Sequence, residues 1–116
     1  MGGQTTYYRV EAYIKPYKLN EVRGALVAAG IPGMTAIEVK GADRQGQIEI
    51  YRGAEFRTDF LPRLKLEVLV LGQNMRDKAV RAVMDAASTG KSGDGLITIT
   101  EIMRVLKISN GEDYVP

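Results

Sequence analysis

Leu64-Lys65-Leu66-Glu67-Val68-Leu69-Val70 is the stretch that decides the fold, because it is the clearest strand pattern in the chain. Every second residue from Leu64 to Val70 is aliphatic, which predicts one face turned toward a core. The chain then has Asn74, a predicted helix N-cap, and Thr89-Gly90, a predicted helix end. Between them lies an apolar stripe at helical spacing: Ala79, Val80, Val83, Met84 and Ala87. The pattern therefore predicts a strand followed by an amphipathic helix.

The remaining elements complete two copies of one plan. They are strands at Tyr8 to Ile14, Thr35 to Lys40 and Leu96 to Ile99, and a helix with Leu19, Val22, Leu26 and Ala29 on one face. Met103 to Ile108 forms an apolar tail with strand character. The order β-α-β, a gap, then β-α-β predicts an α+β, ferredoxin-like βαββαβ sandwich, with two helices on one face of an antiparallel sheet. We expect a single domain over residues 1–116, with residues 1–7 as a flexible tail.

The gap is a long loop after the second strand, over about residues 42–60. It is rich in charges and has poor periodicity, and loops of about 20 residues inside a compact domain are usually functional or disordered. Two interpretations stay open, a solvated hairpin and a docking arm for a partner. We expect the segment from Asp43 to Thr58 to be mobile without a partner.

Composition removes several classes of function. The chain has no cysteine and no histidine, which excludes thiolate chemistry and the histidine-dependent hydrolase and zinc readings. The net charge of +2 is too small to indicate nucleic acid. No apolar run is long enough to span a bilayer, and the first residues do not form a secretion signal. We expect a cytoplasmic protein.

A glycine-rich segment follows the second predicted helix: Thr89-Gly90-Lys91-Ser92-Gly93-Asp94-Gly95. Glycines let the backbone approach an anion, and successive backbone N–H groups can cradle a phosphate. The segment does not have the Walker A form, and an ordinary helix-to-strand turn would explain its glycines equally well.

Several blocks of sequence together resemble the PII family of signal-transduction proteins, in its order and near its spacing. These blocks are Tyr13-Ile14-Lys15-Pro16-Tyr17-Lys18-Leu19, Gly33-Met34-Thr35, Glu38-Val39-Lys40-Gly41, Tyr51-Arg52-Gly53-Ala54-Glu55, Asp59-Phe60-Leu61-Pro62 and the glycine segment 89–95. The resemblance covers roughly Tyr8 to Glu112.

This resemblance implies a non-enzymatic regulator that is a homotrimer without a permanent cofactor. Family members bind ATP or ADP between subunits, and 2-oxoglutarate joins through a magnesium ion on ATP. The long loop, called the T-loop, reaches a partner: a membrane transporter or an enzyme of nitrogen or carbon metabolism. We therefore expect adenine nucleotides as ligands, control of such a partner, and reversible recruitment to a membrane transporter.

The family's site residues carry over position by position. By resemblance, the base would be lined by Thr35, Glu67 and Leu69; the phosphates would meet Asp43, Arg44, Gln45, Gly93, Asp94, Gly95 and Lys107. Gln45 would help to hold magnesium and the effector, and Arg63 would hold an effector carboxylate or anion. The docking residues would be Tyr51, Arg52, Glu55 and Phe56.

The chain departs from the family at phosphate-binding positions. Leu96 and Ser109 replace two cations, Asp43 adds a negative charge, and Lys107 replaces an arginine. We expect the ATP advantage to shrink, with ADP or AMP binding comparably and magnesium-dependent 2-oxoglutarate binding weak. Phe56 has no hydroxyl, so it cannot be nucleotidylated, and we do not expect this modification at Tyr51.

Three alternatives compete with this reading. One is a divergent PII-like paralogue that senses ADP or AMP with a small anion such as bicarbonate, for carbon uptake or fixation. A second is an acylphosphatase-like enzyme, which needs a phosphate-cradling loop with an arginine after the first strand; Lys15-Pro16-Tyr17-Lys18 stands there instead. A third is an RNA-binding sheet, which needs exposed aromatics that Leu64 to Leu71 lacks.

Overall fold

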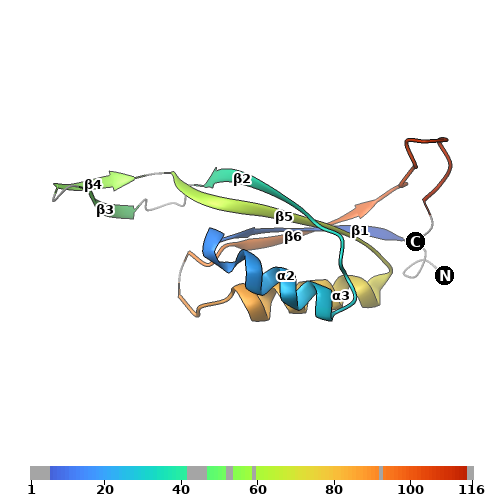
Figure 1. Ribbon diagram of the computed structural model, residues 1–116, viewed down its shortest axis with the longest axis horizontal. Coiled ribbons are helices and arrows are strands. Elements are labelled where there is room, and N and C mark those ends of the chain that lie inside the picture. Colours follow the sequence, from blue (N-terminus) through green and yellow to red (C-terminus); the bar gives the residue numbers. More distant parts are fainter. Residues whose placement is uncertain (1–5, 42–46, 52–53, 59, 92, 115–116) are drawn as a thin grey trace.

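The structure is a computed structural model that describes residues 6–41, 47–51, 54–58, 60–91 and 93–114. Its elements are β1 (Tyr7–Ile14), the 3-10 helix η1 (Pro16–Lys18), α2 (Leu19–Ala28), β2 (Thr35–Gly41), β3 (Gln47–Tyr51), β4 (Ala54–Thr58), β5 (Leu61–Leu71), α3 (Gln73–Ala87) and β6 (Leu96–Ile102). Figure 1 shows the main sheet with α2 and α3 together on one side of it.

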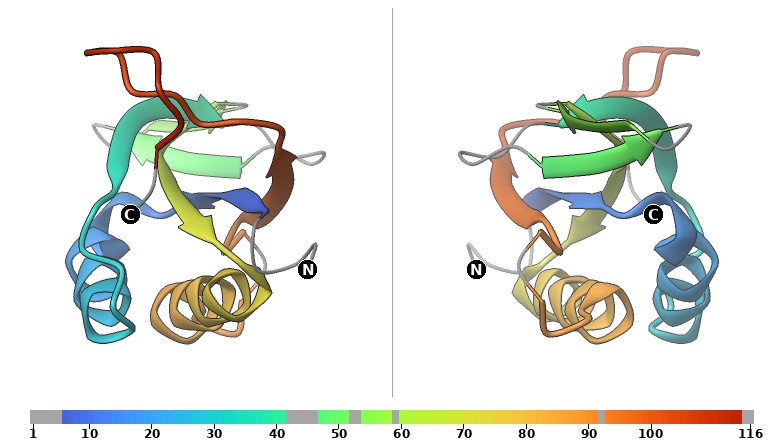
Figure 2. Two further views of the ribbon diagram at one scale, coloured as in Figure 1. Left: turned by 90° about the vertical axis from the view of Figure 1, so that its right-hand side faces the viewer. Right: turned by 90° about the vertical axis from the view of Figure 1, so that its left-hand side faces the viewer.

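The main sheet has the strand order β2-β5-β1-β6, and all three neighbouring pairs are antiparallel. The end-on views in Figure 2 show both helices below the sheet. This is the ferredoxin-like arrangement that the order of elements predicted.

The core lies between this sheet and the two helices. On β1 and β5, alternate residues face the helices, and the register places Val10 opposite Val68 and Ala12 opposite Leu66. The helices contribute Val22, Leu26 and three residues of α3, of which Ala79 is fully buried between them. The alternation that predicted the strands therefore also selects the core residues.

The face of the sheet opposite the helices carries a cluster of charges. Glu11 is 7% exposed and accepts ion pairs from Arg9 at 2.6 Å and Lys65 at 3.4 Å. Lys65 also pairs with Glu67 at 3.2 Å, and its bonds to Glu67 and Glu11 raise the pKa of its ammonium group. Of these pairs, Lys65–Glu11 links β5 to β1, whereas Arg9–Glu11 and Lys65–Glu67 each lie within one strand.

The predicted gap contains a second, two-stranded sheet. β3 and β4 pair antiparallel, with Gln47 opposite Thr58 and Tyr51 opposite Ala54. Figure 1 shows this hairpin projecting beyond the main sheet, in a molecule with principal extents of 57 × 28 × 23 Å. We call residues 42–60 the arm. Within the arm the structure describes the paired strands β3 and β4 and residue 60, while mobility and docking stay predictions.

The structure corrects the predicted starts of two elements, β1 and α3. β1 begins at Tyr7, so this residue is not part of a flexible tail. Gly72, not Asn74, occupies the N-cap position of α3, with φ of +88° and its carbonyl accepting from Arg76 N at 3.1 Å. Asn74 lies inside the helix because the chain turns at the glycine directly after β5.

The apolar tail is also not the predicted strand. β6 continues to Ile102, and the chain then folds back on itself, with one isolated bridge between Leu106 and Asp113. A positive φ at Gly111 makes the reversal, and Asn110 Oδ1 accepts from Glu112 N. Ile108 projects fully into solvent. The apolar side chain of Ile108 is therefore not part of the core of this chain.

Candidate functional site

The glycine loop, residues 88–95, connects α3 to β6 and packs tightly on the end of β1. Gly90, Gly93 and Gly95 all have positive φ, at +77°, +86° and +112°. A Cβ on Gly95 would lie 1.8 Å from the Tyr13 carbonyl oxygen, closer than any real contact. Only glycine fits at this position, so the loop is pressed against the end of β1.

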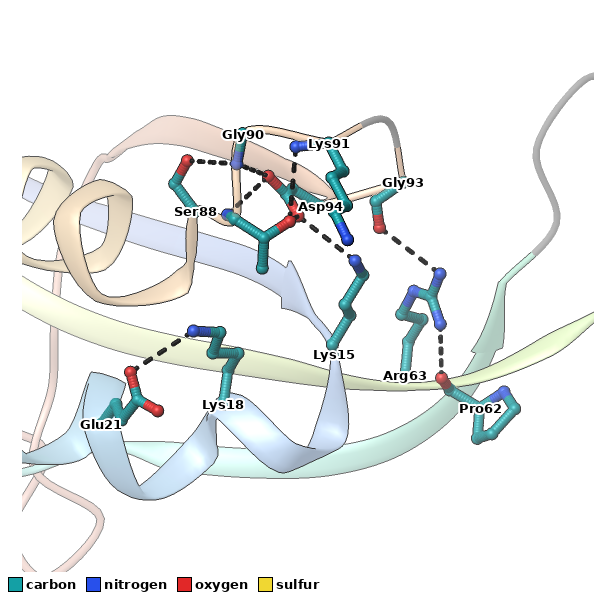
Figure 3. Close-up of polar contacts among 11 residues, drawn as sticks. Lys15, Lys18, Glu21, Pro62, Arg63, Ser88, Gly90, Lys91, Gly93 and Asp94 are labelled. Atoms are coloured by element: carbon teal, nitrogen blue, oxygen red, sulfur yellow. Dashed lines mark hydrogen bonds and ion pairs between the residues drawn. The ribbon is translucent and has the colours of Figure 1, made fainter.

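Asp94 organises the loop from within. Its Oδ2 accepts from the backbone N–H of Thr89 at 2.8 Å and of Gly90 at 3.1 Å, while Oδ1 accepts from the Thr89 hydroxyl. Lys15, at the end of β1, donates to Oδ1 at 3.3 Å (Figure 3). The bonds from Thr89, and then Lys15, hold the pKa of this carboxyl well below its usual range. Asp94 therefore braces the loop as a carboxylate.

Arg63, near the start of β5, reaches the same loop from another side. Its Nη2 donates to the Gly93 carbonyl at 3.4 Å and its Nη1 to the Pro62 carbonyl at 2.9 Å. Figure 3 shows the side chain between the loop and β5. Arg63 and Gly93 also line a cavity of about 310 Å³, together with Gly95 and Leu96. The structure thus brings Arg63 together with the predicted cradle residues Gly93, Asp94 and Gly95.

A larger cavity of about 550 Å³ lies where the loop meets the C-terminal half of α3. Its wall includes Met84 of α3, Thr89 and Asp94 of the loop, and Ile97 of β6. Met84 is 54% exposed beside it. The loop is therefore flanked by two cavities, the smaller one beside Gly41 and Leu61, where β2 and β5 end, and the larger one beside α3.

The predicted base-lining residues form a separate group. Thr35 of β2 is directly opposite Glu67 of β5, and Leu69, 42% exposed, follows on the same face of β5. Glu67 lies four residues beyond Arg63, which at about 3.3 Å per residue is roughly 13 Å along the strand. The base group and the glycine loop therefore do not meet within one chain.

Lys107 is also remote from the loop. It lies in the C-terminal segment, where its backbone N–H donates to the Glu112 carbonyl at 2.8 Å. That segment is tied to the start of β1 by the Tyr7 hydroxyl, which donates to the Tyr114 carbonyl at 2.8 Å. Figure 1 shows it at the end of the sheet away from the glycine loop. Within one chain, Lys107 and the phosphate cradle therefore lie at opposite ends of the sheet.

The predicted arm residues are only partly described. Tyr51 ends β3, and Glu55 and Phe56 lie on β4, opposite Ile50 and Glu49 in the backbone register. Asp43, Arg44, Gln45 and Arg52 lie outside the described residues.

Sequence reasoning missed the structural role of Lys15 and Thr89. The sequence places Lys15 only in a block that resembles the P-II family, and Thr89 at a helix end and in the glycine-rich segment. The signal available was a lysine before proline and a threonine before the glycines. Neither reveals a shared aspartate partner, which is 79 residues from Lys15.

Comparison with known proteins adds the deciding observation. The profile of the family described as "Nitrogen regulatory protein P-II" matches residues 7–112. The chain belongs to the P-II family. Among P-II relatives, it is 51% identical over 105 residues to the protein of Rhodobacter capsulatus, covering 90% of this chain and 93% of that protein. It is 47% identical over 106 residues to "Nitrogen regulatory protein P-II 1" of Escherichia coli (strain K12), covering 90% and 94%.

A solved P-II structure is similar in fold. The Arabidopsis thaliana PII protein bound to citrate aligns with a TM-score of 0.72 and 26% identity, over 97% of this chain and 89% of that one. The predicted family and fold are confirmed, and this P-II protein is a regulator rather than an enzyme. Within the described residues, no cluster of three or more acidic side chains that could hold a metal is present. No described helix has the length and apolar character needed to cross a membrane.

Proposed function

We propose that this P-II protein binds an adenine nucleotide between two copies of the chain. The glycine loop of one copy would hold the phosphates, and the Thr35–Glu67–Leu69 group of the other would hold the base. One observation carries this proposal: the two groups lie on different parts of one chain, roughly 13 Å or more apart along β5. Each group is incomplete alone, and a neighbouring copy in a homotrimer would complete it.

The exposed side chains around the loop support a change in nucleotide preference. Leu96 is 72% exposed at the start of β6, where it offers the outer phosphates no charge. Hydrogen bonds to charged groups are worth about 1.5–3 kcal/mol. ATP, with the greatest phosphate charge, loses most from this site, so ADP or AMP would bind comparably. The same observation favours the alternative of a paralogue that pairs ADP or AMP with bicarbonate.

The regulatory output belongs to the arm in this proposal. Its hairpin projects from the main sheet, where it can contact a transporter or a metabolic enzyme without disturbing the core (Figure 1). Magnesium would enter with ATP through Gln45, and Arg63 would hold 2-oxoglutarate or a smaller anion. The protein would act in the cytoplasm, with reversible recruitment to a membrane transporter.

Mixing two variants tests whether the site is shared. Leu69→Glu places a negative charge in the base group, and Lys91→Glu places one in the glycine loop; both positions are exposed, so both variants should fold. Each variant alone should bind ADP weakly by calorimetry. After the two are unfolded and refolded together, random assembly would restore about one quarter of the sites.

Recovery of no sites in the mixture would contradict a site shared between copies. Light scattering of the unmixed protein should give a homotrimer, and a monomer at micromolar concentration would also contradict it. The same calorimetry with ATP, ADP, AMP, 2-oxoglutarate and bicarbonate, with and without magnesium, tests the ligand preference. Tight ATP binding strengthened by magnesium and 2-oxoglutarate would overturn the expected loss of the ATP advantage.

A further inference from the structure

The C-terminal segment, residues 103–114, has little apolar packing of its own. The chain leaves β6 at Ile102, reverses at Gly111 and returns to the start of β1 (Figure 1). Met103 is 96% exposed and Ile108 is fully exposed, so neither side chain packs against the core. A two-stranded hairpin is at best marginally stable in water without a packed apolar face. The fold of this segment therefore depends on its polar contacts.

Backbone hydrogen bonds pair the two halves of this C-terminal hairpin. The Tyr114 N–H donates to the Val105 carbonyl at 2.8 Å, and the Lys107 N–H donates to the Glu112 carbonyl at 2.8 Å. The Gly111 N–H donates back to the Lys107 carbonyl at 2.9 Å. Both backbone groups of Lys107 are therefore bonded within the hairpin, and its position depends on the hairpin staying closed.

Side chains fasten the returning half of the hairpin. The Tyr7 hydroxyl donates to the Tyr114 carbonyl at 2.8 Å, and the centroids of the two rings lie 6.2 Å apart, within the range of aromatic pairs. Partial burial raises the pKa of the Tyr7 hydroxyl and the nearby Tyr114 adds to this, so the group is a donor at neutral pH. Arg104 Nη2 lies 3.0 Å from Asp113 Oδ1. We call Tyr7, Arg104, Asp113 and Tyr114 the clasp.

The clasp joins the hairpin to the rigid part of the fold. Tyr7 pairs with Ile102 of β6 on one side and with β5 on the other, so its backbone is fixed in the main sheet. Asp113 and Tyr114 follow Glu112, the last residue of the family match, so the family profile does not account for them. The clasp therefore orders a segment that would otherwise sample many conformations.

We propose that the clasp is a positioning device that preorganises Lys107 for the phosphates of a nucleotide held by a neighbouring copy. Lys107 is remote from the glycine loop of its own chain, so the phosphates it meets would belong to the site of a second copy. A segment that is already ordered loses less conformational freedom on binding, and affinity scales with the fraction of molecules in the competent conformation. The effect on affinity rests on the proposed nucleotide site; the ordering of the hairpin does not.

Hydrogen exchange of the full-length, ligand-free protein tests the ordering directly. The clasp variant, Tyr7→Phe with Asp113→Asn, keeps both rings but removes the hydroxyl donor and the ion pair. The Lys107 and Gly111 N–H groups should then exchange about tenfold faster, as expected for the loss of one or two exposed polar contacts. The Val10 N–H, in the middle of the main sheet, should exchange at an unchanged rate.

The chain offers a matched control for both substitutions. Tyr17→Phe removes the hydroxyl of another exposed tyrosine. Asp77→Asn breaks an exposed pair with Arg76 on α3 that has the same 3.0 Å separation. This control variant should leave the exchange of Lys107 and Gly111 unchanged, because neither position touches the C-terminal hairpin.

Calorimetry with ADP tests whether the clasp acts through Lys107. The clasp variant should bind ADP about threefold to tenfold more weakly, and the control variant should bind it as the unmodified protein does. Lys107→Gln should also weaken binding. Added to Lys107→Gln, the clasp substitutions should have little further effect, because no cation remains at that position to be held in place. A clasp with a merely structural role would lower the affinity by the same factor with and without the lysine.

The proposal fails if Lys107 and Gly111 exchange at the same rate in the clasp variant and in the unmodified protein. Equal effects of the clasp and control variants would overturn it too, as would losses of ADP affinity that multiply when the clasp variant is combined with Lys107→Gln. Absence of adenine nucleotide binding in the unmodified protein would instead reject the proposed function. Hydrogen exchange would in that case still decide whether the clasp orders the hairpin.

Discussion

Replacing Gly95 with alanine should be the most damaging single-methyl change in this protein. The added Cβ would lie 1.8 Å from the Tyr13 carbonyl oxygen, and that separation must grow to at least 3.0 Å. Tyr13 is in a sheet strand and pairs with Leu96, so the backbone at the start of β6 has to move. A positive φ adds a cost of about 1–2 kcal/mol for any residue with a side chain.

Gly90→Ala is the matched control for this prediction. Gly90 has a positive φ of +77° in the same loop, but an added Cβ there meets no atom within 4 Å. It should lose only about 1–2 kcal/mol of unfolding free energy, the cost of the positive φ. Gly95→Ala should lose about 2–5 kcal/mol, because overpacking adds about 1–3 kcal/mol.

Urea denaturation at one fixed protein concentration measures both losses, since any assembly makes stability depend on concentration. If the two variants were equally stable within about 0.5 kcal/mol, the close approach of Gly95 to Tyr13 would be refuted. Both variants should keep the far-ultraviolet spectrum of the unmodified protein at low urea, because the core does not involve either glycine.

Three further changes have outcomes that follow from burial and charge. Gly24→Ala, inside α2 with open space around the added Cβ, should raise the unfolding free energy by about 0.5–1 kcal/mol; a loss in urea denaturation would contradict this. Leu26→Ala, at a fully buried site, should lower the unfolding free energy by about 2–5 kcal/mol. Val27→Ala, at a half-exposed site, should lower it by roughly 0.5 kcal/mol or less. Equal losses in the two variants would refute the assigned buried face of α2. The pKa of Asp94 is lowered in the folded protein, so its contribution to stability is present above the unfolded pKa of about 3.9 and disappears as pH falls toward the folded pKa. In Asp94→Asn, the urea midpoint should therefore fall less steeply with pH below about pH 4 than in the unmodified protein. An equally steep fall in both proteins would contradict the assigned role of Asp94 in the loop.

The sequence predicted the order and type of the main-sheet elements correctly, because alternation and helical spacing report burial directly. The N-cap and the C-terminal tail were predicted wrongly for related reasons. Asn74 is a good capping residue, but Gly72 begins the turn two residues earlier. Met103, Leu106 and Ile108 are apolar but exposed in this chain, and Asn110 and Gly111 reverse the chain direction after them. Local preference cannot decide these points when a neighbouring turn takes precedence.

The sequence by itself determined the family and the two glycine-containing regions on which the proposed function depends. It did so because residue types in a fixed order, from Tyr13 to Gly95, are a property of the chain alone. It also placed Arg63 and Asp94 near the candidate site, through the family resemblance.

Only the tertiary structure decided what those residues contact. Lys15 reaches Asp94 across 79 residues, and Arg63 reaches the Gly93 carbonyl across 30. Such contacts depend on strand register and on the direction of a side chain, and neither is encoded by local periodicity. The same holds for Gly95, whose missing Cβ matters because folding brings the Tyr13 carbonyl to that position. Periodicity specifies which face of a strand is buried, while packing of distant segments specifies which atoms meet.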